Sequence, residues 1–442
     1  MHTDAYRQMD RHALWHPYTK HSAQQEDPFP VIVRGEGVYL YDTDGQRYLD
    51  AISSWWACNL GHGNPRLIAA ITRQAAELQH SILGNLSHPR AIELADQLAA
   101  LFPGSPRRTL FASDGASAIE AALKIAIQYW YNVGHPQRRR FVSLRGAYHG
   151  DTLGAVSIGR MDGFHRPFDP LLFPALQAEA PCCSQCEHGR DPGNCPLSCY
   201  ASMQRLIEEH RAELAAVVVE PLCQGTAGIR IYSPRYLTRL AAHCREHDIL
   251  LIADEVAMGF GRTGKMFACE HAGVDPDITC LGKGLSSGYL PISATVVREK
   301  IFDTFHDRPI DHTLYHGHTF TGNPIACAVA LETLRIYAEE QIVTLAAQRG
   351  AELAQQMDTL RELPGVRNVR CLGMIGAVEL GDGRDEAQGA RAAQAVRQRL
   401  FAQRILLRPL GNVVYLMPPF VISPTDLAAT VQALRAAIVA PP

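Results

Sequence analysis

The sequence predicts an α/β fold, with a large, mostly parallel, doubly wound sheet domain and a smaller α+β domain. Parallel strands buried on both faces are indicated by three short, continuously apolar segments, ELAAVVVEPL, DILLIADEV and DITCLGKG. Helical stretches such as SPRYLTRLAAHCREH separate them, and this alternation is typical of a doubly wound sheet. The 442 residues provide enough chain for one large α/β domain with a smaller one appended to it.

The elements follow in three segments. Residues 1–64 contain short strand-like pieces with turn signals, such as VYLYDTDGQRYLD, and are expected to contribute to the small domain. Residues 65–328 are expected to form the large domain, in which RTLFASDGAS reads as strand, loop and helix start, followed by the helical SAIEAALKIAIQYW. Residues 329–442 begin with amphipathic helices and continue with the strand-like RCLGMIGAVEL and NVVYLMPPFVIS, which predicts the small α+β domain.

Composition disfavours several classes of function. The chain has 42 Lys plus Arg against 45 Asp plus Glu, so its charge gives no reason to expect nucleic acid or an anionic membrane as a partner. No apolar run approaches the roughly 20 residues that span a bilayer. The start, MHTDAYRQMDRHALW, lacks the apolar region of a signal peptide. We therefore expect a cytoplasmic enzyme that acts on small molecules.

Polar residues directly follow the predicted strands of the large domain. They are Asp114 to Ala116, Tyr148 to Asp151, Glu220, Asp254 and Lys283. In an open α/β sheet the ligand binds at the carboxyl ends of the strands, so these residues are expected to share one site. Gly115 and Ala116 open a helix whose free N–H groups suit an anion, although small residues there are more often a simple cap.

Two charged residues carry the chemistry. Asp254 ends an apolar strand, where a carboxylate can hold a protonated ring nitrogen, or can simply cap a helix. Lys283 is one of only five lysines and lies between glycines after an apolar strand. Burial there favours the neutral amine that a Schiff base requires, whereas an isolated strand-end lysine more often extends to solvent.

Taken together, these features predict a pyridoxal-phosphate site. An anion site, a strand-end Asp254 and then Lys283, 29 residues later, are the parts that such a site needs, and Tyr148 is placed to stack on the ring. One such match arises easily by chance, but several in the right order at the right strand ends do not.

The chain also resembles a known family. DEVAMGFGRTGKMFACEHAGVDPDI resembles the class III aminotransferases of fold-type I, which depend on pyridoxal phosphate. LWHPYT together with ISSWW resembles the branch that acts in biotin synthesis, and the similarity continues to RPLGNVVYLMPP near the end of the chain. The resemblance implies conversion of 8-amino-7-oxononanoate to 7,8-diaminononanoate. It implies S-adenosylmethionine as amino donor, with L-lysine as an alternative donor and a general ω-amino acid:pyruvate aminotransferase as an alternative function.

The resemblance implies roles for individual residues. Lys283 would form the Schiff base and move the proton, while Thr319 in YHGHTFTGNP would reach the cofactor phosphate of a neighbouring subunit in a homodimer. His318 stands where members that use adenosylmethionine often have proline. The implied cofactor-binding residues are Gly115, Ala116, Tyr148, Asp254, Lys283, His318 and Thr319. The implied substrate-binding residues are Tyr18, Trp55, Trp56, Tyr148, Gly317 and Arg408.

A keto acid with a long apolar chain suits these substrate-binding residues. The aromatic side chains would form a wall for the chain, and the distant guanidinium of Arg408 would bind the carboxylate. For the Trp55–Trp56 pair alone, packing in the core is the commoner role.

A cysteine-rich loop is the remaining feature. Cys183, Cys186, Cys195 and Cys199 follow a spacing close to that of short zinc-binding ribbons, which predicts a structural zinc ion. Free thiols or a redox-sensitive disulfide are the alternatives.

Overall fold

The computed structural model describes residues 3–22, 29–186 and 195–440. Its centre is a seven-stranded sheet with the strand order β4-β12-β11-β10-β7-β5-β6. Neighbours from β11 to β6 are parallel, whereas β12 is antiparallel to both β11 and β4, so the predicted large, mostly parallel sheet is confirmed. The strands are β4 (Arg107–Ala112), β5 (Arg140–Leu144), β6 (Leu176–Ala178), β7 (Leu214–Val219), β10 (Leu250–Asp254), β11 (Ile278–Leu281) and β12 (Ser293–Arg298).

Strand β7 shows why these strands are continuously apolar. Ala216 and Val218 belong to one buried cluster, which includes residues of the helix Gly115–Asn132 (α6). Val217 and Val219 point the other way and belong to a second cluster, formed with the helices Ala201–His210 (α9) and Pro234–Glu246 (α10). Because side chains alternate along a strand, a sheet covered on both faces needs apolar residues at every position.

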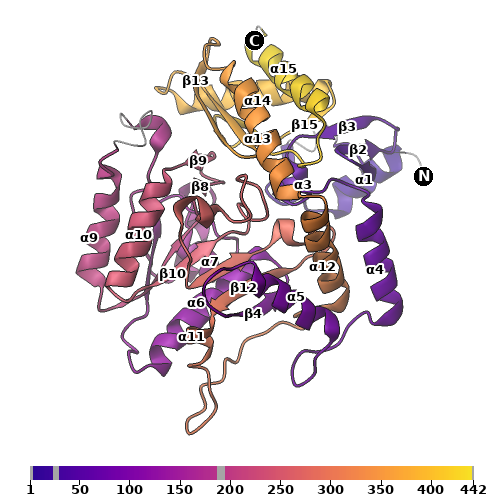
Figure 1. Cartoon of the computed structure of the whole chain (residues 1–442). Helices are drawn as coiled ribbons and strands as arrows, with labels where there is room; N and C mark the ends of the chain where they lie inside the picture. The colour runs from indigo at the N-terminus through magenta and orange to yellow at the C-terminus, as the bar shows by residue number, and fades with distance from the viewer. Residues whose placement is uncertain (1–2, 23–28, 187–194, 441–442) are drawn as a thin grey trace.

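Helices cover both faces of the sheet (Figure 1). They are α4 (Pro65–Glu77), α5 (Pro89–Ala100), α6 (Gly115–Asn132), α7 (Leu153–Ile158), α9 (Ala201–His210), α10 (Pro234–Glu246) and α12 (Pro324–Glu339). Shorter helices are α1 (Thr3–Ala13), α3 (Ser53–Trp56), α8 (Asp162–His165) and α11 (Glu299–Phe302).

Helix α6 forms where the sequence predicts it. Asp114 caps its N-terminus by accepting a hydrogen bond from the N–H of Ser117 at 2.9 Å. Its predicted apolar face is buried in the sheet, and this face comprises Ile119, Leu123, Ala126 and Trp130. The helix N-terminus is therefore fixed at the edge of the sheet where strand β4 ends.

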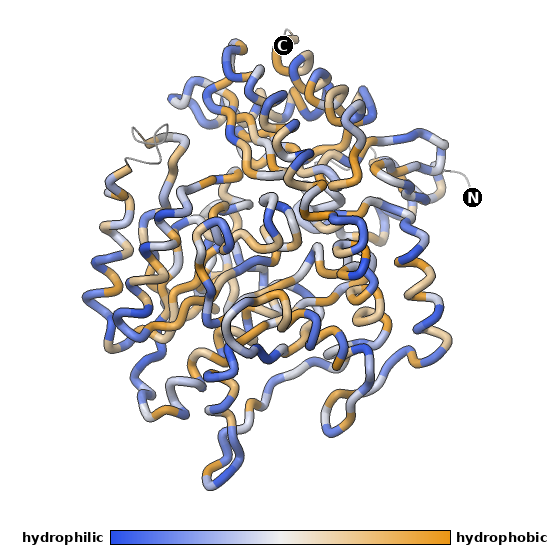
Figure 2. The backbone as a smooth tube through the Cα atoms, in the orientation of Figure 1, coloured by the Kyte–Doolittle hydropathy of each residue, from blue (hydrophilic) through white to orange (hydrophobic). Residues whose placement is uncertain are grey.

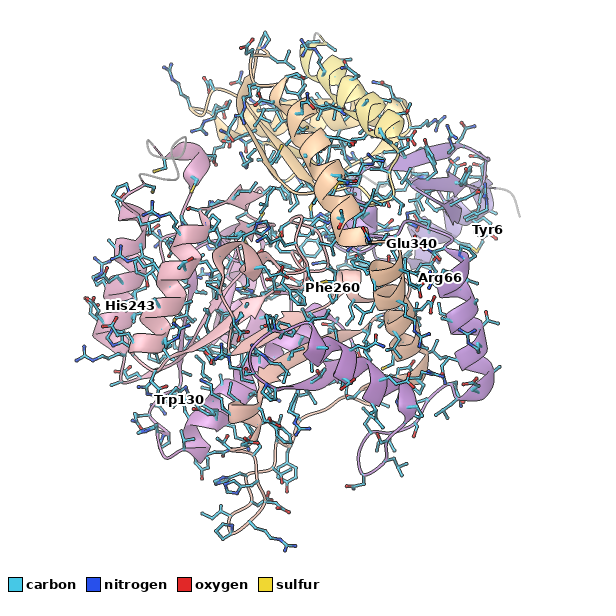
Figure 3. The ribbon with its side chains drawn as sticks, in the orientation of Figure 1. Tyr6, Arg66, Trp130, His243, Phe260 and Glu340 are labelled. Carbon is cyan, nitrogen blue, oxygen red and sulfur yellow. The ribbon has the colours of Figure 1, made fainter. Side chains whose placement is uncertain are left out.

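Helix α4 is tied to α12 by charge as well as by packing. The guanidinium of Arg66 lies 2.7 Å from carboxylate oxygens of Glu332 and Glu339 and 3.4 Å from that of Glu340. Figure 3 shows Arg66 and Glu340 together where the two helices meet. Glu332 is buried, but Arg66, Glu339 and Glu340 are partly or largely exposed, so this network adds modestly to stability.

Smaller sheets lie on one side of the central sheet, with the C-terminal helices at the top of Figure 1. One has the order β1-β2-β3-β15 and joins the two ends of the chain, since β3 pairs in parallel with β15. A second has the order β13-β14-β16, and β8 pairs with β9. Their strands are β1 (Ile32–Glu36), β2 (Tyr39–Asp42), β3 (Arg47–Asp50), β8 (Cys223–Gln224), β9 (Arg230–Ile231), β13 (Val366–Leu372), β14 (Ile375–Leu380), β15 (Ile405–Leu406) and β16 (Val413–Leu416).

The remaining helices are α13 (Ile342–Asp358), α14 (Glu386–Ala402) and α15 (Pro424–Val439). The predicted division of the chain at residues 64 and 328 stays a prediction, and its second boundary falls within helix α12.

Figure 2 shows hydrophobic residues concentrated along the central strands, with polar residues recurring along the outer helices α9 and α10. In the parts of the chain that the structure describes, no helix has the length and apolar character needed to cross a membrane.

Candidate active site

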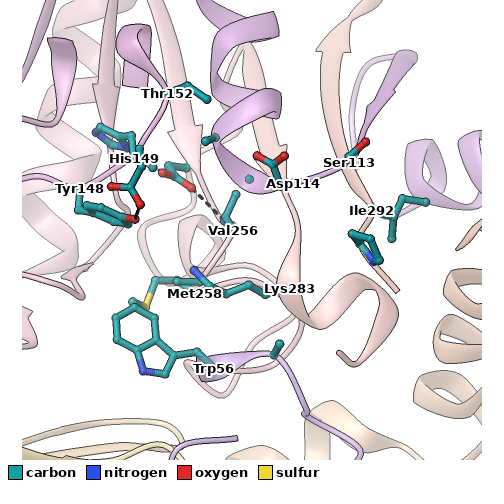
Figure 4. A pocket seen from close by; sticks show the side chains of 18 of the residues that line it. Trp56, Ser113, Asp114, Tyr148, His149, Thr152, Val256, Met258, Lys283 and Ile292 are labelled. Carbon is teal, nitrogen blue, oxygen red and sulfur yellow. Dashed lines mark hydrogen bonds and ion pairs between the residues drawn. The ribbon is translucent and has the colours of Figure 1, made fainter. Parts of the chain in front are cut away.

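A cavity of about 650 Å³ opens at the carboxyl ends of the central strands. The loops after β4, β5, β7, β10 and β11 all contribute to it, as predicted for an open α/β sheet. Figure 4 shows Lys283 in this cavity, with the indole of Trp56 on one side and the loop of Asp114 on the other. The cavity is lined by Gly115, Ala116, Tyr148, Asp254 and Lys283, and also by Trp56, His149, Glu220 and Thr226.

Lys283 enters the cavity directly after strand β11. Its backbone has a φ of 42°, in the left-handed region that side chains other than glycine rarely adopt. The residue is half-buried, and enclosure of its amine lowers the pKa of Lys283 below its ordinary value. The Nζ atom lies 5.1 Å from the centre of the Trp56 ring. A larger share of neutral amine makes Lys283 a better nucleophile than an exposed lysine.

Asp254 ends strand β10 and is held at both carboxylate oxygens. Oδ1 accepts a hydrogen bond from the N–H of Val256 at 3.1 Å, and Oδ2 lies 2.7 Å from Nδ1 of His149. Burial alone would lower the pKa of His149, but the hydrogen bond and charge of Asp254 raise it above its ordinary value. The Nε2 atom of His149 is buried and has no hydrogen-bond partner among the described residues. Together these contacts orient the Asp254 carboxylate at the floor of the cavity.

Glu220 and His149 lie in loops that the sequence points to, but sequence reasoning gave neither residue a role. Glu220 follows strand β7 and accepts hydrogen bonds from the N–H groups of Tyr148 at 3.0 Å and Gly225 at 2.9 Å. Burial raises the pKa of Glu220 to about 7. The side chain thus fixes the loop of Tyr148. The contact between His149 and Asp254 joins residues 105 positions apart, which no local pattern reveals.

The N-terminus of α6 suits an anion. Gly115 and Ala116 lie in its first turn, where backbone N–H groups have no acceptor within the helix. A Cβ atom on Gly115 would approach Cγ1 of Val256 to 2.6 Å, and one on Gly150 would approach Cβ of Ala116 to 2.3 Å. Because these positions carry small residues, the loops that contain Gly150 and Val256 can pack closely against the N-terminus of α6.

Aromatic side chains and one arginine gather beside the cavity. Tyr18 Oη lies 3.5 Å from Tyr148 Oη, and the Tyr18 ring meets the Trp55 ring edge-on at 5.8 Å. Arg408 donates a hydrogen bond to the carbonyl of Tyr18 at 2.7 Å, and its guanidinium lies 4.8 Å from the Trp55 ring centre. Trp56 lines the cavity itself. The structure therefore brings the predicted Tyr18, Trp55, Trp56 and Arg408 together.

Gly317, His318 and Thr319 are not brought to this cavity. None of the three lines it, and their loop lies instead beside α6, where Nδ1 of the neighbouring His316 is 3.2 Å from Nζ of Lys124. His318 donates its backbone N–H to Oγ1 of Thr321 at 2.8 Å. The predicted roles of Gly317, His318 and Thr319 stay predictions.

The predicted zinc site is not supported. The four cysteines are described, although residues 187–194 between them lie outside the described residues. Burial raises the pKa of the Cys183 and Cys199 thiols, and electrostatic interaction with neighbouring cysteines raises it further. Within the described residues, His243, Glu246 and His247 are the single group of three possible ligands whose ligand atoms lie within 4.8 Å of one another, and the cysteines form none. All twelve cysteines are free thiols.

Pyridoxal phosphate fits the groups that line the cavity. The helix end at Gly115 and Ala116 matches its phosphate, the oriented carboxylate of Asp254 matches its ring nitrogen, and the amine of Lys283 matches its aldehyde. Among the described residues the buried Nε2 atom of His149 has no partner, so the floor of the cavity offers a polar group in addition to Asp254.

Comparison with known proteins agrees with this geometry. The family model for aminotransferase class-III matches residues 21–438. An adenosylmethionine-8-amino-7-oxononanoate aminotransferase from Geobacter sulfurreducens is 40% identical over 99% of this chain and 98% of that protein. One from Nitratidesulfovibrio vulgaris is 41% identical over 99% of this chain and 82% of that protein.

Solved structures match this chain over nearly its whole length. The crystal structure of adenosylmethionine-8-amino-7-oxononanoate aminotransferase from Methanocaldococcus jannaschii superimposes with a TM-score of 0.92 and 36% identity, over 99% of both chains. A transaminase from the marine bacterium Virgibacillus reaches a TM-score of 0.91 with 30% identity, over 98% of both chains. This chain belongs to the class III aminotransferases and has their fold-type I architecture.

Proposed function

We propose that this aminotransferase acts in biotin synthesis and converts 8-amino-7-oxononanoate to 7,8-diaminononanoate, with S-adenosylmethionine as amino donor. The observation that carries the proposal is the group of Tyr18, Trp55 and Arg408 beside the cavity of Lys283. A nine-carbon keto acid has an apolar chain for the aromatic rings and a carboxylate for the guanidinium. The names of the relatives from Geobacter sulfurreducens and Nitratidesulfovibrio vulgaris agree with it.

Pyridoxal phosphate, when bound, supplies an electron-withdrawing ring that makes the substrate's α-proton removable. Lys283 would contribute an amine whose lowered pKa raises its neutral fraction, so that Nζ would act as the nucleophile and as the carrier of the proton. Asp254 would pair with the proton on the ring nitrogen, and His149 keeps that carboxylate oriented through the 2.7 Å contact. The N–H groups of Gly115 and Ala116 would hold the phosphate.

The substrate side is shaped by the aromatic residues. Tyr148 would stack on the ring of the bound cofactor, and Glu220 holds the loop of Tyr148 through its backbone N–H. Trp56 closes the cavity below Lys283, and Trp55 with Tyr18 lines the route to Arg408. The aromatic wall excludes water from the apolar part of the substrate, and the guanidinium fixes its far end.

We further propose that the active unit is a homodimer in which Gly317, His318 and Thr319 complete the partner's site. Their loop carries exposed aromatic side chains, with Tyr315 at 81% and Phe320 at 60% exposure, which suits burial against a second copy. The cytoplasm is the compartment we propose, and free thiols suit its reducing conditions.

The test is the visible absorbance of the purified protein with bound pyridoxal phosphate. We expect S-adenosylmethionine to abolish the yellow band, and 8-amino-7-oxononanoate to restore it. A Lys283→Ala variant should fold and bind cofactor but show neither change. Loss of the yellow band with L-lysine alone would show that L-lysine, and not S-adenosylmethionine, is the amino donor. His318 would then be the residue to test for a role in the choice of donor. A response to neither donor, with turnover of an ω-amino acid and pyruvate, would overturn the proposed substrate.

A further inference from the structure

Four consecutive residues beside the cavity have left-handed backbone conformations. Ser53, Ser54, Trp55 and Trp56 have φ values of 49°, 43°, 71° and 71°. Ser54 and Trp55 have ψ values of 59° and 44°, so this segment is a left-handed turn. None of the four is glycine. Residues with side chains normally enter this region singly and not in runs.

Such a turn needs support from its surroundings. The left-handed conformation is unfavourable for a residue other than glycine, and four such residues in a row persist only where neighbouring contacts hold them. Backbone strain of this kind concentrates at functional sites. The turn carries both tryptophans of the substrate side, so its supports decide where the aromatic wall stands.

One support comes from strand β3. Oδ2 of Asp50 accepts a hydrogen bond from Oγ of Ser54 at 2.7 Å and lies 2.9 Å from Nε2 of His62. Oδ1 of Asp50 accepts the N–H of Ile52 at 3.3 Å. Asp50 is 1% exposed, so its charge depends on His62 as a partner.

A second support comes from Arg262, which is 1% exposed. Ser53 Oγ donates to the carbonyl of Met417 at 2.7 Å and accepts from Nη2 of Arg262 at 3.3 Å. Arg262 also donates to Oδ1 of Asn59 at 2.7 Å and to the carbonyl of Pro418 at 2.8 Å. Arg262 therefore fixes the start of the turn, whereas Asp50 fixes its exposed middle.

The turn directs the two indoles to different places. The Trp56 indole donates from Nε1 to Tyr415 Oη at 3.1 Å, and Trp56 is 5% exposed. Trp55 is 45% exposed, and its ring has Tyr18 at one edge and Arg408 over its face. Within the part of the chain that the structure describes, the Trp55 indole has no hydrogen bond like that of Trp56, so the position of Trp55 depends on the backbone of the turn.

We propose that Asp50 and His62 are positioning residues that hold the left-handed turn through Ser54 and so set the place of Trp55 in the substrate wall. This inference rests on the proposed function for its substrate. Neither residue touches the cavity around Lys283, so the pair acts on substrate affinity and not on the chemistry at Nζ.

The surroundings of His62 make this support sensitive to pH. Burial would lower the pKa of His62, but its hydrogen bonds to Asp50 and Cys58 raise it to about 9. Directly after strand β1 the backbone of Gly37 pairs with that of His62, while the carboxylate of Glu36, the last residue of β1, is exposed and bonded to Arg34.

Further titratable groups interact with the two partners of His62. Arg262 and Tyr415 interact electrostatically with Asp50, and Tyr289 interacts with Cys58. The paired state is complete below the ordinary histidine pKa of 6.5 and weakens as pH rises through about 9, where His62 loses its proton.

The first experiment compares His62→Gln with a matched control, His243→Gln, in the cofactor-loaded enzyme. His243 lies on α10 and bonds to Tyr200 Oη at 3.0 Å, away from the cavity (Figure 3). We expect H62Q to raise KM for 8-amino-7-oxononanoate about tenfold, with kcat changed less than twofold, since a charge-assisted hydrogen bond is lost. H243Q should leave both constants unchanged. Between pH 7 and pH 10 the wild-type KM should rise with a midpoint of about 9, and the H62Q variant should lack this step.

A second variant, Ser54→Ala, removes one hydroxyl and leaves the ion pair intact. If both residues act through Asp50, the combined variant S54A/H62Q should show little more than the larger single effect, because the two changes break one chain of contacts. The pair H62Q/H243Q should be additive. Equal losses of kcat and kcat/KM, or additive effects of S54A and H62Q, would overturn the proposal.

A readout without substrate separates this inference from the proposed function. Trp15 and Trp55 are 84% and 45% exposed, whereas Trp56 and Trp130 are buried, so a Trp15→Phe background leaves Trp55 as the exposed tryptophan. In that background, H62Q and S54A should change quenching of fluorescence by acrylamide, and H243Q should not. No turnover of 8-amino-7-oxononanoate by the wild type would refute the proposed function alone. Unchanged quenching in H62Q and S54A would refute the positioning role alone.

Discussion

Arg408 is the residue on which recognition of the keto acid depends. We expect Arg408→Ala to raise KM for 8-amino-7-oxononanoate by about 30-fold, equivalent to about 2 kcal/mol, because the substrate carboxylate loses its charged partner. Arg408→Lys should recover only part of this, since an ammonium group lacks the planar fork of a guanidinium. Steady-state kinetics, with the keto acid concentration varied at a fixed donor concentration, would measure KM for each variant.

Arg404 supplies the control for this prediction. It lies four residues earlier and bonds to Tyr48 Oη at 2.7 Å, outside the cavity. Arg404→Ala should leave KM unchanged. A KM that is equally unaffected by Arg408→Ala would mean that the carboxylate is bound elsewhere.

At the scale of single residues, the sequence locates groups at strand ends but not their partners. Asp254 and Lys283 follow buried strands, so their convergence follows from the rules of parallel sheets. His149 lies in a loop the sequence singles out, yet its contact with Asp254 depends on how two strands align. The left-handed φ values of Ser53 to Trp56 are equally hidden, because no glycine or asparagine marks them.

At the scale of elements, the N-terminus of α6 links stability to cofactor binding. Asp114→Ala should lower the free energy of unfolding by about 1 kcal/mol, because Ser117 loses its cap. It should also weaken binding of pyridoxal phosphate, since Gly115 and Ala116 lie in the first turn that the cap holds. Asp114→Asn keeps a capping oxygen and should preserve both properties. Denaturant unfolding without cofactor and titration with pyridoxal phosphate measure the two effects.

Helix α14 provides the comparison. Asp385 caps it in the same way, accepting the N–H of Gln388 at 3.0 Å, far from the cavity in sequence and in the fold. Asp385→Ala should cost similar stability and leave cofactor affinity unchanged. If Asp114→Ala binds pyridoxal phosphate as tightly as the wild type, the first turn of α6 is not its phosphate site.

Elements with strong periodicity are the ones the sequence predicts well. Strand β7 is apolar at every position because both of its faces are covered, and α6 buries the stripe from Ile119 to Trp130. The cysteine loop shows the opposite case. Its spacing is that of a metal ribbon, but spacing along a chain does not bring four sulfur atoms into the geometry of one ion.

At the scale of the whole molecule, the shared site of the proposed homodimer can be tested by mixing two defective variants. Lys283→Ala and Thr319→Ala should each be impaired. In a mixed dimer, one site combines both changes and the other has neither. Random exchange of subunits should therefore restore about a quarter of wild-type activity. Activity that stays at the average of the two variants after exchange would contradict a site built from two chains.

The scarcity of lysine in this chain also has a practical consequence. Lys20, Lys124, Lys265 and Lys300 are exposed, and none of them lines the cavity, whereas Lys283 is half-buried inside it. Coupling of lysine side chains to a resin would therefore attach the protein through these four surface lysines. Reduction of the bound cofactor with borohydride should in turn leave a single labelled peptide after digestion, the one that contains Lys283.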